Sequence, residues 1–175
     1  MRHPIRSTLV ALTLLSCAAQ ASAGQPAYIG KYLSTPEDTR AIERVVDNFK
    51  AAIKARDVRA LSSLLVNGNI PWASPASPER IRTVRETIDP HFDGEAAGGF
   101  QGFMRMLRTE KEPVEERFYN VRITQDGHIA WVMFDYEFVF DNKVSNYGLE
   151  TWQMRKVQDG SWKIASVWWS SHPPK

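Results

Sequence analysis

The chain has 175 residues, with 22 Lys and Arg against 20 Asp and Glu, and 43% of its residues are hydrophobic. This length corresponds to one domain plus a segment outside the fold, and the hydrophobic content is sufficient for one core. The near-balanced charge excludes a strongly basic protein, so nucleic acid is not an expected partner.

Residues 1–23 have the features of a secretory signal peptide. Arg2 and Arg6 form a basic start, an uncharged apolar run follows, and residues 21–23 give the small-x-small pattern that signal peptidase accepts. We therefore expect cleavage after Ala23 and a periplasmic or secreted protein. Both arginines leave with the leader, which brings the net charge of the remaining chain to zero.

The single cysteine, Cys17, lies inside this leader. The cleaved protein would then lack a disulfide, a zinc–thiolate site and a cysteine nucleophile together. Residues 14–17 also resemble a bacterial lipobox, in which Cys17 becomes the lipidated first residue. The alternative localisation is therefore a lipoprotein anchored through Cys17, and without that lipid no membrane attachment is expected, because the apolar run is too short to span a bilayer.

The following segment, 24–36, is expected to be a linker or arm, and the domain is expected to cover 37–172. Thr35 is a plausible N-cap and Pro36 suits the first helical position. A helical face then recurs every three or four residues. Its members are Ile42, Val45, Val46, Phe49 and Ile53. Asp57 is expected to cap a second, shorter helix that ends before the turn at 67–69.

Three further elements are expected before the sheet-forming region. Residues 70–72 read as a short edge strand, since Pro71 cannot donate to a ladder. Ser77 caps a third helix that ends by Asp89. Residues 91–99 are irregular and glycine-rich, and 99–107 could form a short helix.

From residue 114 onward the apolar residues alternate with a period of two, which is typical of half-buried strands. Four strands are expected, at 116–124, 128–140, 144–157 and 161–172. The turns between them are Asp-Gly, Asp-Asn and Asp-Gly, which are strong hairpin signals. Gly148 in the middle of the third strand predicts a bulge or bend.

This order of elements resembles the nuclear transport factor 2-like superfamily. Residues 41–65 resemble its opening helices, 100–107 its short helix before the sheet, 126–138 its middle strand and 148–170 its closing hairpin. The resemblance is nearest to SnoaL-like domains of exported bacterial proteins. It implies a cone-shaped α+β fold, with three N-terminal helices packed in a bent antiparallel sheet around a pocket, and homodimers that pair through the sheet. It does not imply a function, because this fold carries many activities.

Asp135 is the candidate general base. It alternates with Glu137 on one strand face, and two carboxylates in a pocket could work as acid and base. The alternative interpretation places this face at the solvent or at a dimer contact, with the acids paired to Arg122, Arg155 or Lys156. The opposite strand face is the more apolar and is expected to be core.

Five aromatic residues are candidate ligand-binding residues. They are Trp72, Tyr119, Tyr147, Trp152 and Trp168. The four histidines are scattered without ligand spacing, so no metal site and no cofactor are expected.

Three functions stay open at this stage. The first is an exported protein with an aromatic-lined pocket that binds a small apolar or aromatic molecule. The second is an isomerase, cyclase or lyase that uses Asp135 as general base. The third is a homodimeric assembly or accessory module that acts through its sheet surface.

Overall fold

The computed structural model describes residues 26–30, 34–95 and 98–174. It divides into two units, Met1–Lys31 and Tyr32–Lys175. In the first unit, residues 26–30 form a turn in which the Ile29 amide donates to the Pro26 carbonyl at 3.0 Å. The predicted leader, 1–23, and Cys17 lie outside the described residues. The rest of this section concerns the second unit.

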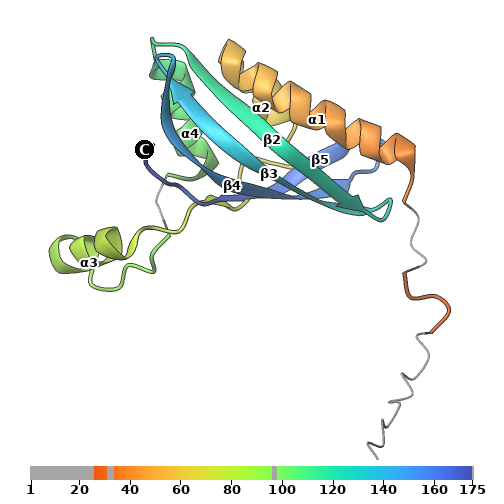
Figure 1. The fold of residues 1–175 in the computed structure, drawn as a ribbon, viewed down its shortest axis with the longest axis horizontal. Coiled ribbons are helices and arrows are strands. Elements are labelled where there is room, and N and C mark those ends of the chain that lie inside the picture. The colour runs from red at the N-terminus through yellow and green to blue at the C-terminus, as the bar shows by residue number, and fades with distance from the viewer. Residues whose placement is uncertain (1–25, 31–33, 96–97, 175) are drawn as a thin grey trace, which may run out of the picture. The chain divides into compact units, whose positions relative to one another are not determined.

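Helix α1, Pro36–Ala55, begins and ends as the sequence predicts (Figure 1). The Thr35 hydroxyl accepts from the Asp38 amide, and Pro36 occupies the first turn, where a missing N–H costs nothing. Arg56 ends the helix in the left-handed conformation. The predicted apolar face is buried, and it supplies the largest helical surface of the core.

Three shorter helices follow α1. Asp57 caps α2, Val58–Ser63, by accepting from the Ala60 amide at 2.9 Å. Helix α3, Pro78–Thr87, has Ser77 as its N-cap and no buried residue, so it does not pack into the sheet as the three-helix expectation required. Helix α4, Gly99–Thr109, instead buries its apolar face against the core.

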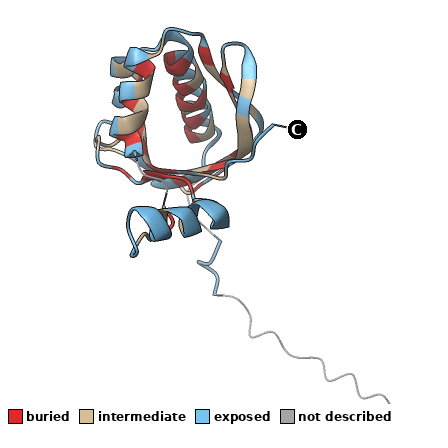
Figure 2. Cartoon of the chain, turned by 90° about the vertical axis from the view of Figure 1, so that its left-hand side faces the viewer, coloured by how far each residue is buried: buried red, intermediate tan, exposed pale blue. Residues whose placement is uncertain are grey.

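The sheet has five strands in the order β1-β5-β4-β3-β2. The four long strands form the predicted antiparallel meander. They are β2, Val114–Gln125, β3, Ile129–Phe140, β4, Lys143–Lys156, and β5, Trp162–Trp169. Strand β1, Trp72–Ala73, lies at the edge after Pro71 and pairs in parallel with β5. The sheet curves around α1, and the buried residues line the space between the helices and its concave face (Figures 1 and 2).

Gly148 marks a close approach of backbone to backbone in β4. A Cβ atom at this position would overlap the Ser170 carbonyl oxygen and contact its hydroxyl. The Ser170 hydroxyl also accepts from the Leu149 amide at 3.0 Å. Only glycine therefore lets the chain after β5 run this close alongside β4, where Tyr147 and His172 continue the antiparallel pairing.

The first turn of α1 is tied to the far end of the sheet through Asp38. Its carboxylate accepts from the Trp162 indole nitrogen at 2.9 Å and lies 2.7 Å from the Lys156 ammonium. These two donors, the Lys156 bond first, lower the pKa of Asp38 to about 2. The contact links the N-terminus of α1 to the end of β4 and the start of β5.

No helix in 26–30, 34–95 or 98–174 is long and apolar enough to cross a membrane. Within the same ranges, no group of three or more His, Cys, Asp or Glu side chains is arranged to hold a metal ion.

Candidate functional site

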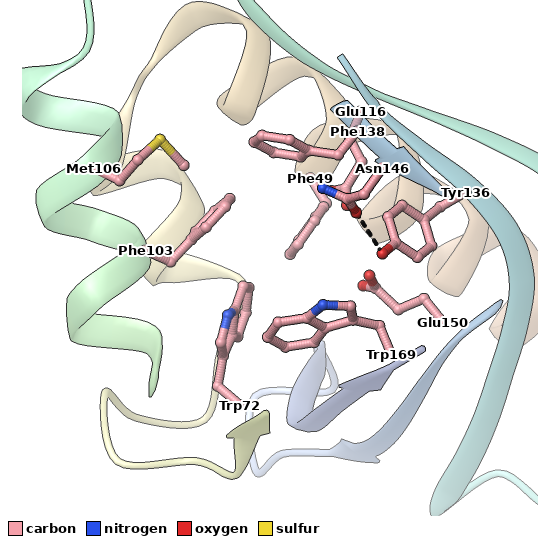
Figure 3. A pocket seen from close by; sticks show the side chains of 10 residues that line it. All are labelled: Phe49, Trp72, Phe103, Met106, Glu116, Tyr136, Phe138, Asn146, Glu150 and Trp169. Atoms are coloured by element: carbon pink, nitrogen blue, oxygen red, sulfur yellow. Dashed lines mark hydrogen bonds between the residues drawn. The ribbon is translucent and has the colours of Figure 1, made fainter. Parts of the chain in front are cut away.

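A cavity of about 190 Å³ lies between the helices and the concave face of the sheet (Figure 3). An engineered protein cavity of roughly 150 Å³ binds benzene, so this space suits one ring with a short substituent. Most of its wall is aromatic. The lining residues are Phe49, Trp72, Phe103, Met106, Glu116, Tyr136, Phe138, Asn146, Glu150 and Trp169.

The aromatic wall comes from segments far apart in the sequence. Phe49 lies on the buried face of α1, Trp72 on the edge strand β1, and Phe103 on α4. The Trp72 ring centroid lies 6.0 Å from that of Phe49, 5.2 Å from that of Phe103 and 6.3 Å from that of Trp169. These spacings are those of packed aromatic pairs, so the wall is held by ring–ring contacts before any ligand enters.

Strand register places the polar residues of the cavity on the same face of the sheet. Glu116 is directly opposite Phe138, which is directly opposite Asn146. Four residues further along β4, Glu150 pairs with Trp169. Because directly opposite residues share a face, each carboxyl group stands beside an aromatic ring.

Glu150 is buried, with 4% of its surface exposed. The Trp152 indole nitrogen donates to its Oε1 at 2.6 Å, and no other described residue bonds the carboxyl group. Burial raises the pKa of Glu150 to about 8, because the charged form loses its water, and the Trp152 bond offsets only part of this effect. Figure 3 shows its carboxyl group directed into the pocket.

Glu116 is the second carboxyl group of the pocket. Its side chain is partly accessible because the cavity reaches it, and none of the described residues forms a hydrogen bond or ion pair with it. Burial raises the pKa of Glu116 well above its ordinary value, and the negative charge of Glu150 raises it further. The two carboxyl groups therefore oppose each other's ionisation.

Along the concave face of the sheet, Tyr136 lies between the Glu116–Phe138 pair and the Glu150–Trp169 pair. Its hydroxyl is 2.7 Å from Asn146 Oδ1 and 2.9 Å from the Ser170 carbonyl oxygen, and its single proton goes to one of these acceptors. Burial raises the pKa of Tyr136, and the charges of Glu150 and Glu116 raise it further. Three acidic groups thus share one apolar pocket.

The chemistry of this arrangement follows from the raised pKa values. A protonated carboxyl group can donate a hydrogen bond or a proton to a bound molecule, and an ionised one can accept a proton or face a cation. A group with a pKa near neutral populates both forms at physiological pH. The described residues of the pocket include no pair of metal-ligating side chains apart from the two glutamates.

Of the six residues named from the sequence, Trp72 lines the pocket. Trp152 does not line the pocket; it is fully buried and donates a hydrogen bond to Glu150, which does. The other four candidate residues lie outside the pocket. Tyr119, Asp135, Tyr147 and Trp168 are on the convex outer face of the sheet or at its edge.

Asp135 does not reach the cavity. It is exposed, and the Asn120 side-chain amide donates to its carboxylate at 2.7 Å. It lines a shallow depression on the outer face together with Tyr119 and Tyr147. Strand alternation explains this position, because Phe134 and Tyr136 on either side of it point into the core.

Trp168 lies outside because of a bulge in β5. Gln153 pairs with Ser166 and Met154 pairs with Ile164, which leaves Ala165 as an extra residue. The extra residue reverses the alternation, so Trp169 and not Trp168 faces the cavity with Ile164. Trp168 is 40% exposed.

Two informative pocket residues were not among the sequence candidates. Glu116 and Glu150 are charged residues on strand faces that otherwise carry apolar side chains, such as Phe118 beside Glu116 and Trp152 beside Glu150. That exception to the pattern was the available signal for a buried carboxyl pair.

No protein-family model matches the sequence, and no curated protein is significantly similar to it in sequence. A nuclear transport factor 2-like (NTF2-like) protein of unknown function from Shewanella baltica OS155 has a similar structure, with a TM-score of 0.60 and 16% identity. That match covers 81% of this chain and 99% of the other.

Two further similar structures carry an assigned activity. One is assigned by inference as a scytalone dehydratase, from Novosphingobium aromaticivorans, with a TM-score of 0.54 and 17% identity over 78% of this chain and 85% of that one. The other is assigned by inference as a dehydratase of the NTF2-like family, from Streptomyces avermitilis, with a TM-score of 0.54 and 18% identity over 80% of this chain and all of that one.

The chain has the NTF2-like fold. The predicted α+β class and the resemblance to this superfamily are confirmed at the level of the fold. The narrower SnoaL-like and exported assignments stay predictions. Identities below 20% in these structures carry the fold and not the activity.

Proposed function

We propose that the protein binds a small, largely apolar molecule in the cavity between α1, α4 and the concave face of the sheet. The observation that carries this proposal is the cavity of about 190 Å³ with six aromatic side chains and two carboxyl groups in its wall. Such a site combines apolar area for affinity with a few polar groups for orientation. The ligand is a single ring or a comparable branched group with one polar substituent.

The test is a titration of the protein with benzyl alcohol in which calorimetry measures the affinity. We expect binding to the wild type and at least a roughly ten-fold loss in Met106→Trp, because the larger ring would fill the cavity at the α4 wall. Arg105→Trp is the matched control, since Arg105 is exposed on the neighbouring position of α4. Equal affinities of the wild type and Met106→Trp would place benzyl alcohol outside this pocket and overturn the proposal.

A second candidate function is acid–base catalysis, of the isomerase, cyclase or lyase type, with Glu150 and Glu116 in place of Asp135. The raised pKa values of the two glutamates favour it, because a protonated and an ionised carboxyl group can then coexist near neutral pH. Two structures of the same fold are assigned by inference as dehydratases, so the fold itself is compatible with chemistry of this class. An enzyme of this kind loses activity in Glu150→Gln and keeps it in Glu137→Gln, which changes the outer face.

A homodimer through the outer sheet face is the third proposal. Tyr119, Trp131, Leu149 and Trp168 lie on that face and are each at least 40% exposed. Exposed aromatic and aliphatic side chains gathered on one face favour a protein contact. The pocket opens on the other face of the sheet, so pairing would leave it accessible.

We further propose that the protein is exported, as the leader at 1–23 predicts, and is either released after cleavage at Ala23 or anchored through Cys17. Native mass spectrometry of protein purified from its own host tests this directly. A mass that begins after Ala23 supports the soluble form, and a lipid on Cys17 supports the anchored form. A retained leader overturns both. The same spectrum reports the oligomeric state and any small molecule that stays bound.

A further inference from the structure

The cavity wall is acidic and has no counter-charge. Among its ten described lining residues, two are glutamates and one is a buried tyrosine, and none is Lys, Arg or His. Glu116 has no hydrogen-bond partner among the described residues, and Glu150 has one, on one of its two oxygens. Buried carboxyl groups are usually paired with a cation or hydrogen-bonded on both oxygens. The pocket therefore contains carboxyl oxygens that have no partner among the described residues.

The charged groups on each element around the pocket point to the same conclusion. Strands β2, β3 and β4 contribute Glu116, Tyr136 and Glu150, while α4 and β5 contribute only apolar side chains to the lining. On α1, Lys50 is directed elsewhere, since its ammonium lies 2.9 Å from the Asp47 carboxylate and 5.9 Å from the Phe118 ring centroid. The described elements thus supply no cation to neutralise the two glutamates.

The rest of the wall is suited to a cation with apolar substituents. Aromatic ring faces carry partial negative charge and attract ammonium groups, most strongly where water is excluded. The rings come from several sides of the cavity. Trp72 and Phe103 are 5.2 Å apart, and Phe103 and Phe138 are 6.3 Å apart in an edge-to-face arrangement. A metal ion, by contrast, requires several oxygen or nitrogen ligands, which ring faces do not provide.

We propose that the ligand of this pocket is a small organic monocation, an ammonium group with alkyl or aromatic substituents, held by Glu116, Glu150 and the surrounding rings. This inference rests on the proposed ligand-binding function and names the chemical class of its ligand. The size of the cavity, about 190 Å³, limits the molecule to one ring or one branched ammonium group with a short chain.

The proposal has a consequence for protons. Burial raises the pKa of both carboxyl groups, that of Glu150 to about 8, so the protonated form of Glu150 predominates at neutral pH. A cation favours the ionised form, so its binding releases a proton to the solvent, and its affinity rises with pH. A neutral ligand that accepts a hydrogen bond from a protonated glutamate has the opposite dependence, because it loses its donor as pH rises.

The experiment compares choline with 3,3-dimethylbutan-1-ol, its uncharged isostere. Calorimetry measures the binding of each to the whole protein without its predicted leader, 1–23. Choline keeps its charge at every pH used, so any pH dependence comes from the protein. At about pH 8.5 we expect choline to bind about ten-fold or more tightly than the isostere, and at about pH 5.5 we expect this preference to shrink by a similar factor. Repeating the titration in buffers of different ionisation enthalpy should show proton release with choline and none with the isostere.

Two variants assign the preference to the pocket. Glu150→Gln should reduce the choline preference by about ten-fold, because the amide keeps the shape and removes the charge. Glu137→Gln makes the same change on the outer face of the sheet and should keep the wild-type preference.

The failures of the two proposals are distinguishable. If benzyl alcohol binds in the cavity and choline shows no advantage over its isostere at high pH, the cation assignment is wrong and the binding function stands. The same holds if choline affinity is independent of pH. If neither the alcohols nor choline bind, both proposals are wrong.

Discussion

The indole nitrogen of Trp152 donates a 2.6 Å hydrogen bond to Glu150, two residues earlier in the same strand. Residues two apart in a strand share a face, so the pair stands side by side on the concave side of β4. The bond fixes one carboxyl oxygen of Glu150 in the core and leaves the other directed to the cavity. A fully buried tryptophan thus holds a carboxyl group at the surface of an apolar pocket.

The first prediction concerns the pH dependence of stability. The pKa of Glu150 is raised from its ordinary value of 4.5 to about 8 in the folded protein, so the folded state binds more protons than the unfolded state between these values. The free energy of unfolding of the wild type should therefore fall as pH rises from about 5 to about 8, by at most about 1.4 kcal/mol per pH unit for this group. Glu150→Gln should show a shallower slope. Urea denaturation across this range measures both, and parallel curves would contradict the prediction.

The second prediction concerns the close backbone approach at Gly148. Gly148→Ala should destabilise the fold by about 2 kcal/mol or more, because the added methyl group overlaps the Ser170 backbone and displaces the chain that follows β5. Gly102→Ala is the matched control. Its Cβ would meet only an Arg105 side-chain nitrogen, at 3.8 Å, and alanine in a helix should stabilise by about 0.5–1 kcal/mol. Thermal or urea unfolding of both variants provides the comparison, and equal stabilities would show that the close approach at Gly148 does not constrain the fold.

The third prediction concerns acid unfolding. The pKa of Asp38 is lowered to about 2, chiefly by its bond with Lys156, so its contribution is present above its ordinary pKa of 3.8 and is lost as pH falls toward 2. Asp38→Asn should therefore be less stable than the wild type at neutral pH, and the difference should shrink as pH falls through this window. Trp162→Phe, which removes one donor to Asp38, should raise the pH at which the wild-type contribution is lost. Circular dichroism against pH reads out both effects.

The fourth prediction concerns the outer face. If the homodimer forms there, Trp168→Glu should convert it to a monomer. A symmetric contact uses the same surface of both protomers, so each would bury an unpaired glutamate in the interface. Ile88→Glu changes another exposed apolar residue, just after α3, and should leave the mass unchanged. Light scattering after size-exclusion chromatography measures the mass. A wild-type monomer at high concentration would rule out the contact.

Much of the fold was predictable because its signals are local. The caps at Thr35, Asp57 and Ser77 and the hairpin turns were each recognised from a few residues, and the helices and strands begin close to the expected positions. The expectation that α3 packs in the sheet was wrong. Its apolar residues are too few for a buried face, and α4 supplies the packing instead.

The candidate site was less predictable because it depends on relations between strands. Alternation correctly assigned Asp135 and Tyr136 to opposite faces, but it could not show which face bordered a cavity. The bulge at Ala165 reverses the alternation late in β5, and nothing in the local sequence distinguishes Trp168 from Trp169. The meeting of Glu116 with Glu150 depends on the register of three strands, which the sequence of any one strand does not specify.

The most direct test of the account is a titration of the glutamate side-chain carboxyl carbons by ¹³C nuclear magnetic resonance, in the wild type and in Glu150→Gln. The account predicts that at least one carboxyl group of the wild type titrates near pH 8 and that this signal is missing from the variant. If every glutamate of the wild type titrates close to the ordinary value of 4.5, the two carboxyl groups are not held in an apolar pocket, and the ligand proposals built on them are wrong.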